Sequence, residues 1–130
     1  NNINFIASIP TTSPLRKVSD IDNCIKHAIK KNLDVVFSVT ESAKNPYFNI
    51  VKLKNKKLSL VCSSKKNISR RQDAPQCYDL TTVCYVFKPE YIMKKKNLFS
   101  GKTGFVVIPK HRATDIDDKT DYKIAKFLSY

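Results

Sequence analysis

The feature that most constrains the fold is a continuous apolar run that directly follows an amphipathic helix pattern. Residues 34–39 read Asp-Val-Val-Phe-Ser-Val, which is typical of a strand buried on both faces of a parallel sheet. The preceding pattern predicts a helix with Ser19 as its N-cap and Asn32 as its left-handed stop. Its apolar stripe recurs at three- and four-residue spacing, at Val18, Ile21, Ile25, Ala28 and Ile29. A short buried strand is expected before it, at residues 3–7, and together these elements predict an α/β fold with a partly parallel sheet.

The middle of the chain has a different pattern. Residues 47–53 and 57–62 read as two strands of a hairpin with polar outer positions, joined at Lys54-Asn55-Lys56. The polar stretch 63–76 predicts an excursion away from the main core. Strands are expected again at 82–87 and 104–108, and helices at 89–95 and from about Lys119.

Charge and composition narrow the class of protein. No apolar run approaches the length that crosses a bilayer and no signal segment is visible, which favours a soluble cytoplasmic protein without membrane contact. The net charge of +13 admits a basic nucleic-acid-binding domain. However, only four of the 24 basic residues are arginines, and aromatics such as Phe5, Phe37 and Phe105 lie in core-like segments where they cannot stack on bases. We therefore expect no nucleic-acid partner, with this domain type kept as an alternative.

The four cysteines predict no metal site. Cys24, Cys62, Cys77 and Cys84 form no Cys-x-x-Cys pair, and neither histidine stands at a zinc-site spacing. We expect free thiols, two of them acting as small core residues.

Three polar segments carry a resemblance to a known family. Residues 10–16 read Pro-Thr-Thr-Ser-Pro-Leu-Arg, residues 70–75 read Arg-Arg-Gln-Asp-Ala-Pro, and residues 115–117 read Asp-Ile-Asp, with a further acid at Asp121. Their order and spacing resemble those of acylneuraminate cytidylyltransferases (CMP-N-acetylneuraminic acid synthetases), over essentially the whole chain. The resemblance implies that residues 1–130 are the C-terminal part of one cytidylyltransferase domain. It further implies a Rossmann-like nucleotidyltransferase sheet with flanking helices and an inserted β-hairpin arm, at about 45–76, that forms the dimer contact.

The resemblance also implies the chemistry. Family members are nucleotidyltransferases that move CMP from CTP to the anomeric hydroxyl of a nonulosonic acid, a nine-carbon 2-keto sugar acid, and release pyrophosphate. They use Mg²⁺ and act as homodimers. Their nucleotide site lies largely in an N-terminal Gly-rich loop, whereas the two glycines here are Gly101 and Gly104. We therefore expect these 130 residues alone not to turn over CTP.

Two aspartates are the predicted metal ligands. In an extended segment alternate residues point the same way, so Asp115 and Asp117 present both carboxylates on one side. Carboxylates together with phosphate oxygens are the ligands that Mg²⁺ prefers. Asp118 and Asp121 fit a structural role instead, as the N-cap of the last helix and its first-turn partner.

The predicted substrate contacts come from the resemblance. They are Thr12, Ser13, Arg16, Arg71, Gln72, Thr81 and Thr82. No general base is assigned, so the catalytic residue stays unknown. Lys110, His111 and Arg112 stand just before the acidic pair and either contact pyrophosphate or the sugar acid, or balance neighbouring acids.

Two differences from the family pattern bear on the sugar. Pro10 stands where many relatives have glutamine, and Asp79 stands where a basic residue is common. Both favour a nonulosonic acid related to N-acetylneuraminate rather than that sugar itself. A second alternative is a protein module that has the same fold but no catalytic activity and only forms dimers.

Overall fold

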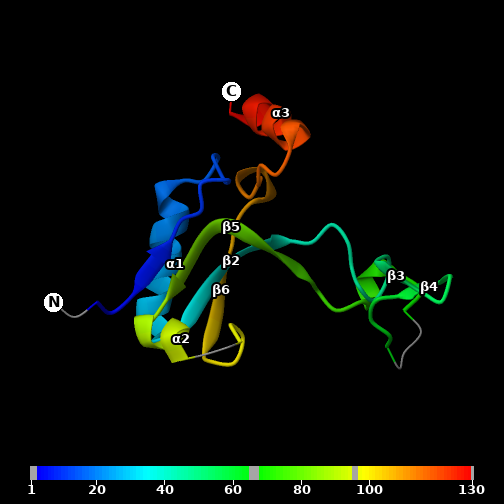
Figure 1. Ribbon diagram of the computed structural model, residues 1–130, viewed down its shortest axis with the longest axis horizontal. Coiled ribbons are helices and arrows are strands. Elements are labelled where there is room, and N and C mark those ends of the chain that lie inside the picture. Colours follow the sequence, from blue (N-terminus) through cyan, green and yellow to red (C-terminus); the bar gives the residue numbers. More distant parts are fainter. Residues whose placement is uncertain (1–2, 65–67, 95–96, 130) are drawn as a thin grey trace. The chain divides into compact units, whose positions relative to one another are not determined.

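The computed structural model describes residues 3–64, 68–94 and 97–129, which form two compact units (Figure 1). The first unit combines Asn1–Thr40 with Leu80–Tyr130 and holds the main sheet and the helices. The second unit, Glu41–Asp79, holds the hairpin.

The main sheet has four strands in the order β1-β5-β2-β6. Their bounds are Ile6–Ser8 (β1), Val35–Glu41 (β2), Tyr78–Phe87 (β5) and Thr103–Val107 (β6). β2 and β6 are parallel, whereas β1 and β5 are antiparallel. The predicted α/β class with a partly parallel sheet and flanking helices is therefore confirmed, and Val35 to Val39 are buried as expected.

The first strand differs from the prediction. β1 begins at Ile6 rather than at residue 3, and it lies at the edge of the sheet with Ile6 and Ala7 exposed. Ile6 pairs with Phe87, so β5 separates β1 from β2. The expectation of a buried strand was wrong because a short apolar run identifies a strand but not its neighbours, and here the neighbour comes from the far end of the chain.

Helix α1 spans Val18–Lys31, and its N-cap stands two residues before the predicted one. Its N-cap is Lys17 rather than Ser19, and the Lys17 N–H donates to the Asp20 carboxylate at 2.9 Å. Asp20 thus satisfies a free backbone donor of the first turn, which explains why Ser19 is not needed as a cap. At the other end Asn32 has φ 47°, the left-handed stop that was predicted.

Helix α1 covers one side of the core. Its Cys24 and Ala28 pack in a buried cluster with Val36, Val83, Cys84, Val86 and Ile108. All four cysteines are free thiols, and Cys24 and Cys84 are buried as predicted. None of the helices in the described ranges is long and apolar enough to traverse a bilayer.

The two shorter helices lie at opposite ends of the first unit (Figure 1). α2 spans Pro89–Lys94, and residue 95 of the predicted helix is outside the described residues. α3 spans Lys119–Leu128 and lies at the end where α1 begins. As predicted, Asp118 caps α3 by accepting the N–H groups of Thr120 and Asp121.

The second unit contains a short two-stranded hairpin. β3, Val51–Lys54, pairs antiparallel with β4, Lys57–Leu60. Asn55 and Lys56 both have positive φ, at 50° and 62°, as a two-residue hairpin turn requires. The first strand is shorter than predicted because residues 45–50 form a turn, with the Tyr47 N–H donating to the Asn45 side chain at 2.9 Å. Within the polar excursion, residues 65–67 lie outside the described residues.

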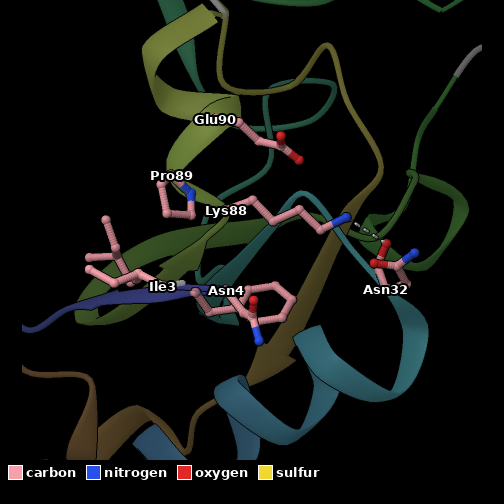
Figure 2. A pocket seen from close by; sticks show the side chains of 8 residues that line it. Ile3, Asn4, Asn32, Lys88, Pro89 and Glu90 are labelled. Carbon is pink, nitrogen blue, oxygen red and sulfur yellow. Dashed lines mark hydrogen bonds between the residues drawn. The ribbon is translucent and has the colours of Figure 1, made fainter. Parts of the chain in front are cut away.

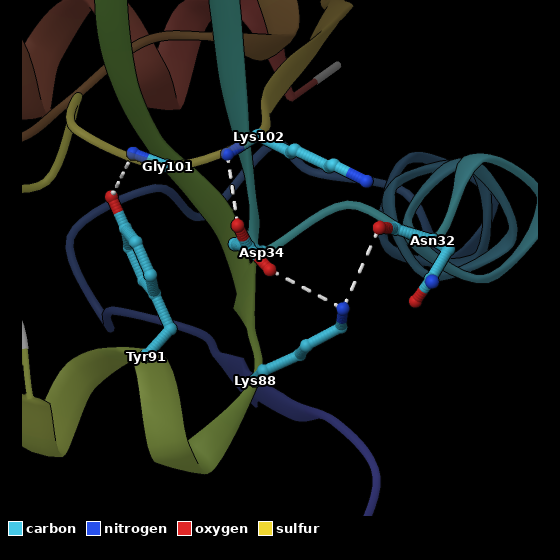
Figure 3. Close-up of polar contacts among 6 residues, drawn as sticks. All are labelled: Asn32, Asp34, Lys88, Tyr91, Gly101 and Lys102. Atoms are coloured by element: carbon cyan, nitrogen blue, oxygen red, sulfur yellow. Dashed lines mark hydrogen bonds and ion pairs between the residues drawn. The ribbon is translucent and has the colours of Figure 1, made fainter.

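A polar network fixes the loop that leads into β6 (Figure 3). The Asp34 carboxylate accepts the Lys102 N–H at 2.9 Å and pairs with the Lys88 ammonium at 3.3 Å. The Lys102 N–H, aided by Lys88, holds the pKa of Asp34 below its ordinary value although partial burial acts in the opposite direction. The Tyr91 hydroxyl lies 2.8 Å from the Leu98 carbonyl and accepts the Gly101 N–H at 3.1 Å. A Cβ at Gly101 would collide with the Tyr91 ring, so glycine is required for this close approach.

Changing Tyr91 to phenylalanine is expected to lower the free energy of unfolding by about 1 kcal/mol, because the hydrogen bonds of its hydroxyl with the Leu98 carbonyl and the Gly101 N–H are lost. Tyr91 is 5% exposed. Urea titration measures the effect, with Tyr122→Phe on the exposed face of α3 as the matched control, expected within about 0.5 kcal/mol of the parent. Equal effects of the two variants would contradict the assigned role of the hydroxyl.

Candidate functional site

The loop of residues 10–16 is held on β5 by Arg16. Its Nε donates to the Ser13 carbonyl at 2.7 Å and its Nη1 donates to the Val83 carbonyl at 3.0 Å. Its Nη2 donates to the Pro10 carbonyl. The guanidinium thereby closes the loop on itself and ties it to the sheet. This gives Arg16 a structural role, and its contact with a ligand stays a prediction.

Four hydroxyl side chains of the loop and of the neighbouring strands β2 and β5 form two hydrogen-bonded pairs. Ser13 is fully buried, and its Oγ lies 2.6 Å from Thr82 Oγ1. Thr81 Oγ1 donates to Ser38 Oγ at 2.7 Å, and Ser38 Oγ accepts the Cys84 N–H at 3.0 Å. The structure therefore places three of the predicted substrate contacts in two hydrogen-bonded pairs, Ser13 with Thr82 and Thr81 with Ser38.

The predicted metal ligands lie against the same loop. The Ile116 N–H donates to the Thr12 carbonyl at 2.9 Å, which places the segment from Asp115 to Asp117 beside residues 10–16. Asp115 Oδ1 is buried and has no hydrogen-bond partner within the described residues. Asp117 is exposed, and its N–H donates to Asp121 at 3.1 Å.

The donor chemistry at this point fits a hard divalent cation. Buried carboxylate oxygens are nearly always hydrogen-bonded, so the lone Oδ1 of Asp115 is an exception that a bound cation would explain. Across the described ranges, no three His, Cys, Asp or Glu side chains cluster closely enough to hold a metal. A cation here would therefore complete its shell with water and substrate oxygens, as Mg²⁺ commonly does.

Tyr85 borders the acidic segment and was not predicted from the sequence. It lies on β5 and makes an edge-on contact with Phe37, with ring centroids 6.0 Å apart. Burial raises the pKa of Tyr85, and the nearby Asp115 carboxylate raises it further. The phenol therefore stays protonated next to Asp115 at neutral pH.

A buried ion pair connects α1 to the residues before the acidic segment. Arg112, in the short 3₁₀ helix Lys110–Arg112, donates to both oxygens of Asp20, at 3.0 and 2.8 Å. Burial acts to raise the pKa of Asp20, but the hydrogen bonds from Arg112 and from the Lys17 N–H outweigh it and hold the pKa below its ordinary value. Of the two roles left open for Arg112, the structure shows the balancing of a neighbouring acid.

Arg71 and Gln72 belong to the second unit. Arg71 Nη2 donates to the carbonyls of Ala43 and Ser42, at 2.8 and 3.2 Å. Both residues line an open groove of about 430 Å³ together with Glu41 and Lys44. The groove offers an acceptor in the Glu41 carboxylate and charged donors in Lys44 and Arg71, and the predicted substrate contacts of Arg71 and Gln72 stay predictions.

A larger pocket of about 690 Å³ lies at the end of the first unit that carries α2 (Figure 2). It is lined by Ile3, Asn4, Phe5, Ile6, Asn32, Lys88, Pro89 and Glu90. Figure 2 shows Lys88 extended toward Asn32, whose carbonyl it approaches at 3.5 Å. None of the predicted site residues lines this pocket.

Comparison with known proteins supports the motif assignment. No family model matches the sequence. The CMP-N,N'-diacetyllegionaminic acid synthase of Campylobacter jejuni subsp. jejuni serotype O:2 is 38% identical over 93 residues, or 72% of this chain and 39% of that protein. The chain is related to the CMP-nonulosonic acid synthetases.

A second relative matches most of the chain. The post-translational flagellin modification protein B of Campylobacter coli is 28% identical over 123 residues, or 95% of this chain and 52% of that protein. The chain thus spans about half the length, or less, of the curated relatives it matches. Neither the nucleic-acid-binding domain nor the non-catalytic module is favoured by these similarities.

Proposed function

We propose that this chain is part of an enzyme, called the intact protein below, that transfers CMP from CTP to the anomeric hydroxyl of a nonulosonic acid and releases pyrophosphate. The similarity to a protein named as a CMP-N,N'-diacetyllegionaminic acid synthase supports the reaction class. The observation that supports the assignment of the site to particular residues is the hydrogen bond from the Ile116 N–H to the Thr12 carbonyl, which joins the acidic segment to the loop at residues 10–16.

Asp115 and Asp117 are the proposed ligands of Mg²⁺. When bound, this ion supplies positive charge next to the phosphoryl oxygens, where negative charge builds up during transfer. The buried Oδ1 of Asp115 supports this assignment, because the protein offers it no donor within the described ranges.

The remaining residues position the reacting groups. In the reaction, the sugar's anomeric oxygen attacks the α-phosphorus of CTP. One P–O bond forms while the bond to the pyrophosphate oxygen breaks, and the hydroxyl proton passes to a base. Arg16 and the Ser13–Thr82 hydrogen bond keep the loop rigid, so Thr12 can orient a substrate without an ordering penalty at each binding event.

The hairpin supports the proposed homodimer. Its register puts Val51, Leu53, Leu58 and Leu60 on one face, and all four are exposed. Lys52, Lys54, Lys57 and Ser59 occupy the other face. A two-stranded hairpin is marginally stable alone in water, so an aliphatic face of this kind gains most from a second copy of the chain.

Incubation of the intact protein with CTP, Mg²⁺ and N,N'-diacetyllegionaminic acid tests the function. We expect a CMP-sugar and pyrophosphate in equal amounts, detected by anion-exchange chromatography and by a phosphate-release assay coupled to pyrophosphatase. N-acetylneuraminic acid should be the poorer acceptor, given Pro10 and Asp79. A chelator is the control and should stop the reaction. No product with any nonulosonic acid, together with tight and steeply salt-dependent RNA binding, would instead support a nucleic-acid-binding protein.

A further inference from the structure

Asp20 is a buried charge in a position that ordinarily belongs to an apolar residue. It precedes Cys24 and Ala28 at four-residue spacing, so all three lie on the inward face of α1, and Asp20 is only 3% exposed. Within the described ranges it is the one charged residue that is buried. A charge in such a place is costly unless it is fully paired, which calls for a specific partner.

Arg112 provides that partner with two-point geometry. Its Nε and Nη2 contact Asp20 Oδ2 and Oδ1 at 3.0 and 2.8 Å, and its side chain is 20% exposed. Paired contacts of this kind fix the orientation of the guanidinium plane as well as its position. The pair therefore locks the 3₁₀ helix Lys110–Arg112 to the first turn of α1.

The locked segment leads directly to the acidic pair. Arg112 stands three residues before Asp115, and Ala113 between them packs against the buried core. The next fixed point is Ile116, whose N–H is bound by the Thr12 carbonyl. Asp115 is thus held between two anchors, the Asp20 pair on one side and the loop at residues 10–16 on the other.

We infer that Asp20 and Arg112 are positioning residues that hold the Asp115–Asp117 segment in place for binding a divalent cation. The inference rests on the proposed function, because it assumes that this segment carries the metal ligands. Neither residue needs to touch the cation or the substrate. Residues that orient metal ligands typically change metal affinity or activity by 10–100-fold when they are replaced.

The test measures the binding of Mn²⁺ to the intact protein in the presence of CTP, with electron paramagnetic resonance as the detection method. Arg112→Lys keeps the charge but loses the two-point contact, and we expect it to weaken Mn²⁺ binding about tenfold. Arg70→Lys is the matched control, because Arg70 pairs with Asp73 on the surface at 3.3 Å with a 69% exposed side chain. Its Mn²⁺ binding should stay within about twofold of the parent.

Binding constants are referred to the folded fraction of each variant, measured by circular dichroism. A merely structural role for Arg112 would reduce the amount of folded protein without changing the Mn²⁺ dissociation constant, and this outcome would overturn the inference. The inference is also overturned if Arg112→Lys binds Mn²⁺ like the parent while an Asp115→Asn, Asp117→Asn variant loses binding. In that case the proposed function stands. Mn²⁺ binding that survives in the double asparagine variant would overturn both.

Discussion

Replacement of both Asp115 and Asp117 by asparagine is expected to lower the rate of CMP transfer by about 10³-fold in the intact protein, because several kcal/mol of transition-state charge stabilisation depend on the bound cation. Asparagine keeps the shape of each side chain and removes the charge that a divalent ion requires. The rate is measured as CMP-sugar formation at saturating CTP and Mg²⁺. Asp22→Asn on the exposed side of α1 is the matched control and should leave the rate within about twofold of the parent.

Stability provides a second readout for Asp115. Its buried Oδ1 lacks a hydrogen-bond donor within the described ranges, so the protein gains nothing from that oxygen when no cation is bound. Asp115→Asn should therefore leave the free energy of unfolding without Mg²⁺ unchanged or slightly higher, while activity falls. Such a trade of stability for activity is typical of functional residues. A variant that lost stability and activity together would instead mark Asp115 as a structural residue.

The elements of the fold were largely readable from the sequence, whereas their order in the sheet was not. The buried run at residues 34–39 and the stripe of α1 contain the local periodicities that specify a strand and a helix. The insertion of β5 between β1 and β2 depends on pairing between residues about 80 positions apart, such as Ile6 and Phe87. Local patterns carry no information about such partners.

The candidate site shows the same contrast between what local sequence patterns indicate and what depends on residues far apart in the sequence. The motifs identified the acidic pair and the loop at residues 10–16, and the Ile116–Thr12 hydrogen bond brings the two segments together. Ser38 was missed although a signal existed, since it is the one polar residue inside the run from Val35 to Val39. Tyr85 gave no such signal, because an aromatic residue in a buried strand is what a core ordinarily contains.

Asp20 is not among the site residues predicted from the sequence. Its four-residue spacing from Cys24 and Ala28 was the sign that it faces inward and needs a partner. The identity of that partner, Arg112, could not be derived, because 92 residues separate the two in sequence. The consequence of this pairing for stability is large enough to measure.

Asp20→Asn is expected to lower the free energy of unfolding at pH 7 by about 3 kcal/mol, because removing one member of a buried ion pair leaves the other charge uncompensated. We take the low end of the range that is usual for buried ion pairs, since the Arg112 side chain is still 20% exposed to solvent. Urea titration measures the change. Asp73→Asn is the matched control at the exposed Arg70–Asp73 pair, and it should cost at most about 1 kcal/mol.

The pH dependence of this difference follows from the pKa of Asp20, which is lower in the folded protein than its ordinary value of 3.8. A depressed carboxyl pKa means that the folded state binds the proton less readily than the unfolded state, so the stabilisation is complete above about pH 5. It decreases as the pH falls through 3.8 and toward the lower folded-state value, where Asp20 becomes protonated and loses its attraction to Arg112. The parent and Asp20→Asn stability curves should therefore converge in acid. A difference that stayed constant from pH 7 down to pH 2 would show that packing, rather than the charge of Asp20, holds Arg112 and the segment that follows it.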